Sequence, residues 1–140
     1  MTNIQIEGPR ADQFTVRRKT GGDYRIFRVV SGADVSLSGM TMTNGNTDDA
    51  GGIMNRATLT ITDSTISANT AQFTGGGIFN GNGATLTVTG SNISDNSSLR
   101  GAGGGIFNDL GTLTITGSTI SDNASVSLAG AVASTTAAAP

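Results

Sequence analysis

Apolar and polar residues alternate in short runs along this chain, and the runs recur. Leu59 and Ile61 alternate with threonines, and the same alternation returns at Leu86 and Val88. A period of two residues is typical of a β-strand with one buried face. We therefore expect short strands that place aliphatic side chains inside and threonines outside.

The alternating runs belong to a longer repeat. Three copies, spaced by 27 residues, are LTITDSTISANTA at 59–71, LTVTGSNISDNSS at 86–98 and LTITGSTISDNAS at 113–125. A diverged copy, VSLSGMTMTNGNT, occupies 35–47. Periods of about 20–50 residues mark solenoids, propellers or arrays, and this one is too short for a four-stranded propeller blade. Each repeat is therefore predicted to form one coil.

A second motif marks another side of each coil. GGGIFN occurs at 75–80 and again at 103–108, and a shorter relative, GGIMN, occupies 51–55. Ile78 and Ile106 are predicted to be buried, and the glycines to permit close backbone packing at a corner. Together with the alternating run and a short strand after it, this motif predicts three strands per coil and a roughly triangular cross-section.

These patterns predict an all-β fold, a single-stranded parallel β-helix, or β-solenoid, of about five coils of roughly 24–28 residues. Successive coils pair in parallel at about 4.8 Å, so that equivalent residues stack. We assign residues 1–34 to an N-terminal partial coil or cap and 35–128 to regular coils. Residues 129–140 are assigned to a decayed repeat and a C-terminal tail, because AGAVAS at 129–134 aligns with the GGGIFN segment.

Asparagines keep the same spacing as the apolar residues. Asn69, Asn96 and Asn123 recur at 27 residues, while Asn80 and Asn108 close the two hexapeptides. An inward asparagine at a corner can bond the corner backbone and its equivalents on neighbouring coils. We expect stacked ladders; the alternative is that these residues only supply left-handed turn conformations.

Two sets of outward side chains are candidates for contact with a partner. Phe79 and Phe107 are expected to point outward, one above the other, as the most exposed apolar feature. Thr60, Thr87 and Thr114 form the middle row of a three-by-three grid that resembles the Thr-x-Thr arrays of solenoid antifreeze proteins. Ice binding is therefore one alternative, although threonine is also the ordinary residue of a solvated strand face. The rest of the grid is Thr58, Thr62, Thr85, Thr89, Thr112 and Thr116.

Composition narrows the chemistry. The chain contains no cysteine and no histidine, which removes disulfides, thiolate metal sites and the commonest general base. Asp95 and Asp122 are 27 residues apart and would stack as a weak cation site, but corner aspartates that cap backbone amides are commoner. Because no repeat carries a unique polar cluster, we expect no catalysis, cofactor or metal ion. The other charged candidates are Asp63, Asp109, Arg56 and Arg100.

Charge is distributed unevenly. The net charge is −2, yet six of the eight basic residues lie in the first 28 positions. A charge run of this kind is ordinarily a solvated face, so we expect no nucleic-acid partner. The sequence contains no run of about 18 apolar residues, so it predicts no membrane-spanning helix. The segment MTNIQIEGPR has no signal-peptide pattern.

At these motifs the chain resembles a known type. GGGIFN, LTITGSTISDNAS and the N-terminal runs NIQIEGPRADQFTV and RIFRVVSGADVSLSGMTMTNG resemble the right-handed parallel β-helix repeats of large bacterial surface proteins. The GG-A-I and F-x-x-N repeats of polymorphic outer-membrane adhesins look related. The resemblance covers about residues 3–128 and implies right-handed coils. It also implies an extracellular or cell-surface location, by analogy, because the signal sequence and anchor usual in the family are not found in this chain.

The function expected from this resemblance is a non-catalytic structural or adhesive scaffold of a cell-surface or extracellular protein. Corner loops such as 48–49 and 98–101 would then be held at fixed spacing for a partner. The expected partners are a surface glycan or protein, or a second copy of the chain. The alternatives are a filament subunit that stacks end to end, a fragment of a carbohydrate-active β-helix enzyme, and the ice binder already mentioned.

Overall fold

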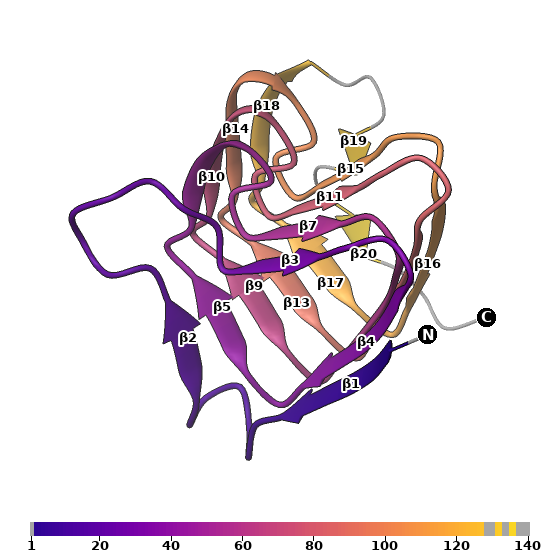
Figure 1. Cartoon of the computed structure of the whole chain (residues 1–140). Helices are drawn as coiled ribbons and strands as arrows, with labels where there is room; N and C mark the ends of the chain where they lie inside the picture. Colours follow the sequence, from indigo (N-terminus) through magenta and orange to yellow (C-terminus); the bar gives the residue numbers. More distant parts are fainter. Residues whose placement is uncertain (1, 128–130, 133–134, 137–140) are drawn as a thin grey trace.

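The computed structural model describes residues 2–127, 131–132 and 135–136, with side chains from Asn3 to Ser127. Within these residues the chain forms strands and no helix. It winds as stacked coils whose strands build four sheets, visited by each full coil in the order A, B, D, C (Figure 1). The predicted all-β parallel solenoid of about five coils is confirmed.

Sheets A and B hold the alternating repeats. Sheet A consists, in spatial order, of β1 (Thr2–Glu7), β4 (Ala33–Ser38), β8 (Thr58–Thr62), β12 (Thr85–Thr89) and β16 (Thr112–Thr116). Sheet B consists of β2 (Thr15–Arg17), β5 (Thr41–Thr43), β9 (Thr65–Ser67), β13 (Asn92–Ser94), β17 (Thr119–Ser121) and β20 (Thr135–Thr136).

Sheets D and C complete each coil. Sheet D consists of β6 (Asn46–Asp49), β10 (Thr70–Thr74), β14 (Ser97–Ala102) and β18 (Ala124–Ser127). Sheet C consists of β3 (Phe27–Val29), β7 (Ile53–Asn55), β11 (Ile78–Asn80), β15 (Ile106–Asn108) and β19 (Ala131–Val132). The GGGIFN motif supplies the sheet C strands.

Sheet D corrects the predicted three-strand, triangular coil, because each regular coil has a fourth strand. The strand is hidden in the sequence since its inward positions are small, as at the buried Ala71 and Ser98. Its register with neighbouring coils also shifts after Ala71 and after Ser98, which breaks the period of two.

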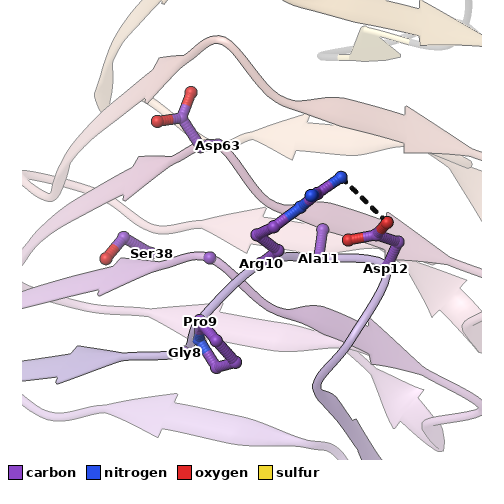
Figure 2. A pocket seen from close by; sticks show the side chains of 8 residues that line it. Gly8, Pro9, Arg10, Ala11, Asp12, Ser38 and Asp63 are labelled. Atoms are coloured by element: carbon purple, nitrogen blue, oxygen red, sulfur yellow. Dashed lines mark hydrogen bonds and ion pairs between the residues drawn. The ribbon is translucent and has the colours of Figure 1, made fainter.

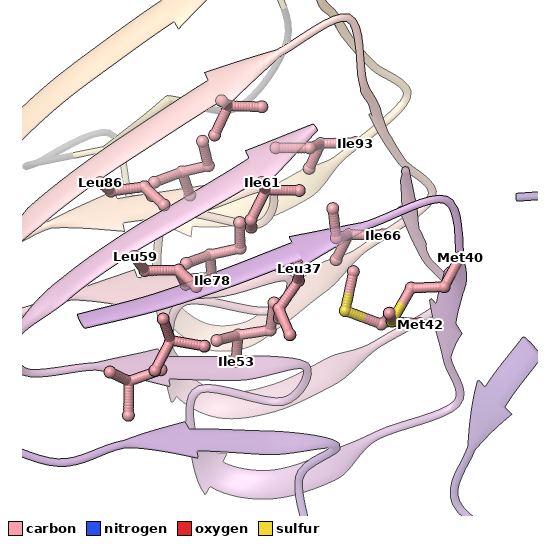
Figure 3. Packing of buried hydrophobic residues seen from close by; sticks show 14 of the residues in the cluster. Leu37, Met40, Met42, Ile53, Leu59, Ile61, Ile66, Ile78, Leu86 and Ile93 are labelled. Carbon is pink, nitrogen blue, oxygen red and sulfur yellow. The ribbon is translucent and has the colours of Figure 1, made fainter. Parts of the chain in front are cut away.

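Rows of stacked aliphatic side chains fill the interior (Figure 3). The strand registers place equivalent residues of successive coils opposite each other. Each such side chain, when fully buried, contributes roughly 1.5–3 kcal/mol to folding, so these rows dominate stability. The rows are Leu59, Leu86 and Leu113; Ile61, Val88 and Ile115; Ile66, Ile93 and Ile120; and Ile53, Ile78 and Ile106.

The corners between sheets turn at residues in the left-handed region. Between sheets A and B these are Gly39, Asp63, Gly90 and Gly117, with φ of 66°, 48°, 57° and 56°. The predicted corner at Asp63, Gly90 and Gly117 is therefore confirmed. The corner between sheets B and D turns in the same way, at Asn44, Ala68, Asp95 and Asp122.

The glycines of the GGGIFN motif have two separate roles. Gly75 adopts a φ of 68° at the corner between sheets D and C. Gly76 is needed for space, because a Cβ there would lie 2.4 Å from the carbonyl oxygens of Ser97 and Gly104. The motif is thus a joint where the backbones of adjacent coils approach closely.

The two ends of the solenoid differ. At the N-terminal end β1 is an unpaired edge of sheet A, and its inward Ile4 and Ile6 remain 42% and 37% exposed. At the other end β19 pairs with β15, and β20 with β17, both antiparallel. A further copy of the repeat, as predicted for 129–134, would pair in parallel, so the chain reverses direction there instead. Residues 129–130 and 133–134 of that prediction, and 137–140 of the predicted tail, lie outside the described part.

We predict that Ile93→Asp abolishes cooperative unfolding. Ile93 is fully buried in the middle of its row, and an unpaired carboxylate there removes more than about 4 kcal/mol from a total stability of about 5–15 kcal/mol. Thermal and urea melts followed by circular dichroism measure this loss. Asn92→Asp, on the exposed side of the same strand, is the control; an Ile93→Asp protein that melts like the parent contradicts the packing described.

Candidate functional site

Asn69, Asn96 and Asn123 form a continuous ladder at the corner between sheets B and D. The side-chain amide of Asn69 donates to Oδ1 of Asn96 at 3.0 Å, and that of Asn96 donates to Oδ1 of Asn123 at 3.0 Å. Each Oδ1 also accepts the backbone N–H of the asparagine one coil earlier, at 3.0 Å. The predicted stacking of these residues is therefore present as hydrogen bonds, rather than as turn conformations alone.

A second ladder runs inside sheet C. Asn80 donates to Oδ1 of Asn108 at 2.8 Å and receives a bond of 2.8 Å from Asn55. Asn55 was not among the predicted ladder residues. The signal for it was available, because Asn55 ends GGIMN as Asn80 and Asn108 end GGGIFN.

A third ladder, made of serines, was missed by the sequence analysis. The backbone N–H of Ser64 donates to Oγ of Ser91 at 3.1 Å, and that of Ser91 donates to Oγ of Ser118 at 3.0 Å. These serines recur at 27 residues, which is the signal that would have identified them. With the three ladders in place, no buried side-chain nitrogen or oxygen among the described residues lacks a hydrogen-bond partner.

Phe79 and Phe107 stack as predicted, but they are not the most exposed apolar feature. Their ring centroids are 5.6 Å apart with an interplanar angle of 24°, and both residues are half-buried. The coil spacing of about 4.8 Å is close to an aromatic stacking distance, so each ring covers a face of the other. Arg56 lies over Phe79, with Cζ 5.8 Å from the ring centroid. The pair therefore offers little free ring surface to a ligand.

A different set of apolar side chains is exposed on the regular coils. Phe73, Leu99 and Val126 belong to the consecutive strands β10, β14 and β18 of sheet D, and they are 45%, 50% and 71% exposed. We call these three residues the sheet D stripe. The sequence analysis assigned 98–101 and 48–49 to corner loops, but these residues lie in strands β14 and β6. It did not group the three apolar residues, because the register shifts of sheet D break the repeat spacing.

The threonine grid lies on the outer face of sheet A in the expected register. Thr60 is paired with Thr87, and Thr87 with Thr114, with the flanking columns aligned in the same way. Thr60 and Thr87 are half-buried and Thr114 is exposed. None of the nine hydroxyls hydrogen-bonds to another described residue, so the grid offers its hydroxyls to solvent.

The acidic candidates do not converge. Asp63 lies at the corner between sheets A and B, and Asp95 and Asp122 stack at the corner between sheets B and D, while Asp109 follows β15 of sheet C. Among the described residues no three carboxylates are close enough together to hold a metal ion. Nor does any helix of the described chain have the length and apolar character needed to cross a membrane.

One cavity adjoins Asp63. It has a volume of about 490 Å³ and is lined by the turn 8–12 together with Ser38 and Gly39 (Figure 2). Arg10 and Asp12 form an ion pair of 3.0 Å there, and both side chains are largely exposed. Figure 2 shows the Asp63 carboxylate pointing away from that pair. Asp12 and Asp63 both line the cavity, and the Asp12 carboxylate is paired with Arg10.

Three arginines gather beside sheet C in the first two coils. Arg25 is fixed by bonds from Nη2 to the Asp49 carbonyl at 2.9 Å and from Nε to the Ala50 carbonyl at 3.3 Å. Burial lowers the pKa of Arg25, and the guanidinium of Arg28 lowers it further. Arg56 acts in the same direction, whereas Asp49 opposes them. We call Arg25, Arg28 and Arg56 the arginine cluster.

Comparison with known proteins agrees with the architecture. The family model described as "Right handed beta helix region" matches residues 12–138. Searches of curated proteins and of solved structures found no match. The match confirms the right-handed coils expected from the sequence.

We predict that Asn96→Ala destabilises the protein by about 3 kcal/mol or more. The change removes the acceptor for the backbone and side chain of Asn69, and an unpaired buried polar group costs about 1–3 kcal/mol. Urea unfolding measures the difference. Asn92→Ala, at an exposed position of the same coil, should change stability by less than about 0.5 kcal/mol; equal effects of the two substitutions would show that the ladder adds nothing.

Proposed function

The chain belongs to the right-handed β-helix family, and we propose that it is a non-catalytic scaffold that holds contact surfaces at fixed spacing on an extracellular or cell-surface protein. The observation that carries this proposal is the repetition of the coils. Equivalent residues stack in register on sheets A, B and C, so the same side chains recur from coil to coil. An active site requires a group of polar residues that one part of the molecule has and the rest lacks.

The distribution of polar residues supports the same conclusion. The buried asparagines and serines bond to each other and to backbone groups, which commits them to holding the coils together. The exposed aspartates of the regular coils are dispersed: Asp63 and Asp109 lie at different corners, and Asp95 stacks with Asp122 at a third. What remains accessible is a set of flat or ridged outer faces, of which the sheet D stripe is the apolar one.

An adhesive scaffold needs such faces more than it needs a cleft. Exposed apolar side chains on a rigid support bind a protein surface without the entropy cost of ordering a loop. Phe73, Leu99 and Val126 are held by parallel strands and project from successive coils. We assign the contact with a protein partner to this stripe.

We expect the purified chain to leave polysaccharides intact. The experiment is incubation with neutral and acidic polysaccharides, with and without Ca²⁺, followed by assays for new reducing ends and for unsaturated ends. A scaffold gives no product above a heat-unfolded control. Product that disappears when Asp63 is changed to Asn would contradict the proposal and would identify an enzyme.

Self-assembly is a second candidate, favoured by the two edges of sheet A. Among the described residues β1 and β16 are the two edge strands of this sheet, and each has one side that pairs with no other strand. Leu113 and Ile115 of β16 are only half-buried, although Leu86 and Val88 one coil earlier are fully buried. Ile6 of β1, with Ile4, would continue both rows if a second copy added its β1 to β16 in parallel. Because β20 lies against β17, the contact would be made through sheet A rather than sheet B.

Sedimentation velocity across a range of concentrations tests this assembly. Ile6→Lys should reduce association, because it places a charge in the row that the second copy would continue. Gln5→Lys adds the same charge on the opposite, outer face of β1 and should have little effect. A parent chain that stays monomeric at the highest concentration contradicts end-to-end stacking and leaves the monomeric scaffold.

A further inference from the structure

The arginine cluster has more positive charge than its surroundings neutralise. The side chains of Arg28 and Arg56 make no hydrogen bond or ion pair with another described residue, and that of Arg56 contacts only the Phe79 ring, with Cζ 5.8 Å from its centroid. In the described chain the one ion pair is between Arg10 and Asp12, at another corner. Two guanidiniums therefore present all their N–H donors to solvent.

The strand register brings these two arginines together. Arg28 lies opposite Met54 in the pairing of β3 with β7, and Arg56 follows Met54 by two residues. The backbone N–H of Arg56 donates to the Val29 carbonyl at 3.0 Å. Arg56 directly follows β7, and its guanidinium lies over the Phe79 ring. Phe79 pairs with Met54, which pairs with Arg28, so both arginines lie on the outer face of sheet C.

Arg25 completes the cluster from the neighbouring corner. Its bonds to the carbonyls of Asp49 and Ala50 hold the guanidinium in one place. The Asp49 carboxylate offsets part of this charge but forms no ion pair with Arg25, and its Oδ1 accepts the Thr74 hydroxyl at 2.6 Å and the Thr74 amide at 3.2 Å. Asp23 and Asp48 line a cavity with Arg25 on the sheet D side.

Arg28 and Arg56 both act electrostatically on Arg25, and an anion placed among these like charges reduces their repulsion. Guanidinium groups offer paired N–H donors that match the oxygens of carboxylate, sulfate and phosphate. Nucleobase binding is disfavoured here, because Phe79 has one ring face covered by Phe107 and lies under Arg56 on its other side. The cluster therefore fits an oxyanion and not an aromatic ring.

We propose that Arg25, Arg28 and Arg56 form a binding site for one oxyanion, a sulfate, phosphate or carboxylate group, on the outer face of sheet C. The anion is either free or carried by an acidic polysaccharide. The assignment of the anion to a polysaccharide rests on the scaffold function proposed above. The existence of the anion site does not depend on that function. In the site Arg28 and Arg56 bind the anion directly, and Arg25 adds fixed positive charge from one side.

Calorimetric titration with sodium sulfate at constant ionic strength tests the site. The variants are Arg28→Gln and Arg56→Gln, which remove no contact that holds the backbone. Each should weaken sulfate binding by about tenfold or more, because a hydrogen bond to a charged group contributes about 1.5–3 kcal/mol. Arg17→Gln and Arg100→Gln remove the same charge elsewhere and should leave the affinity within about twofold. Thermal melts confirm that every variant folds.

Two results overturn the proposal. One is a parent chain that binds none of sulfate, phosphate and acetate. The other is an equal loss of affinity in Arg17→Gln and Arg28→Gln, which would reduce the effect to net charge. Sulfate should also raise the melting temperature of the parent more than that of Arg28→Gln, since a ligand stabilises the state that binds it.

A second titration separates the two sources of the anion. A sulfated oligosaccharide that binds more tightly than free sulfate, and loses that advantage in Arg56→Gln, indicates a polysaccharide ligand. Equal affinity for both indicates a free ion. If the chain binds no oxyanion, the proposed anion site is wrong and the proposed scaffold function still stands. If the chain cleaves the polysaccharide, the proposed scaffold function is wrong and the anion site still stands.

Discussion

The structure depends on the parallel pairing of each coil with the next, in register. Backbone hydrogen bonds along the rod fix a coil spacing of about 4.8 Å, and every side chain then has an equivalent neighbour directly above or below. This single constraint favours residues that pack well against the same residue type on the next coil. Aliphatic side chains do so inside, threonines do so outside, and asparagine and serine do so where a polar side chain is buried.

The asparagine ladders follow from the same spacing. A side-chain amide has both a donor and an acceptor, so one asparagine can donate to the coil on one side and accept from the coil on the other. Asn96 does both while it also binds the carbonyl of Ile66 at 3.0 Å. The asparagine side chains thereby supply hydrogen-bond partners for the polar backbone groups that are buried at this corner. The glycines near Gly76 allow the backbones to come close enough for the ladder to form.

Much of the fold could be predicted from the sequence, because structurally equivalent residues recur at a fixed interval. The rows through Ile93 and Leu86, and the ladder through Asn96, follow directly from residues that recur at 27 positions. Sheet D was not readable, since Ala71 and Ser98 carry no apolar signal and the register shifts there. The exposure of Phe79 was overestimated for a related reason: the prediction treated one side chain at a time, while the coil spacing lets two rings cover each other.

The candidate functional features lie where the repeat is least regular. The sheet D stripe adjoins the register shifts, and the arginine cluster belongs to the first two coils, where the sequence diverges most from the later copies. Local features of this kind cannot be predicted from periodicity, because they depend on which residues the corners bring together. Function in such a rod is therefore expected at its irregular faces and ends, with the regular coils as the support.

The central claim is that the coils are held in register by buried side-chain ladders as well as by backbone pairing. Hydrogen exchange of the asparagine side-chain amides, followed by NMR, tests it most directly. The account predicts that the side-chain amide protons of Asn69, Asn80 and Asn96 exchange only on unfolding, far more slowly than those of the exposed Asn92. Exchange of Asn96 as fast as that of Asn92 would contradict the ladder and the in-register stacking built on it.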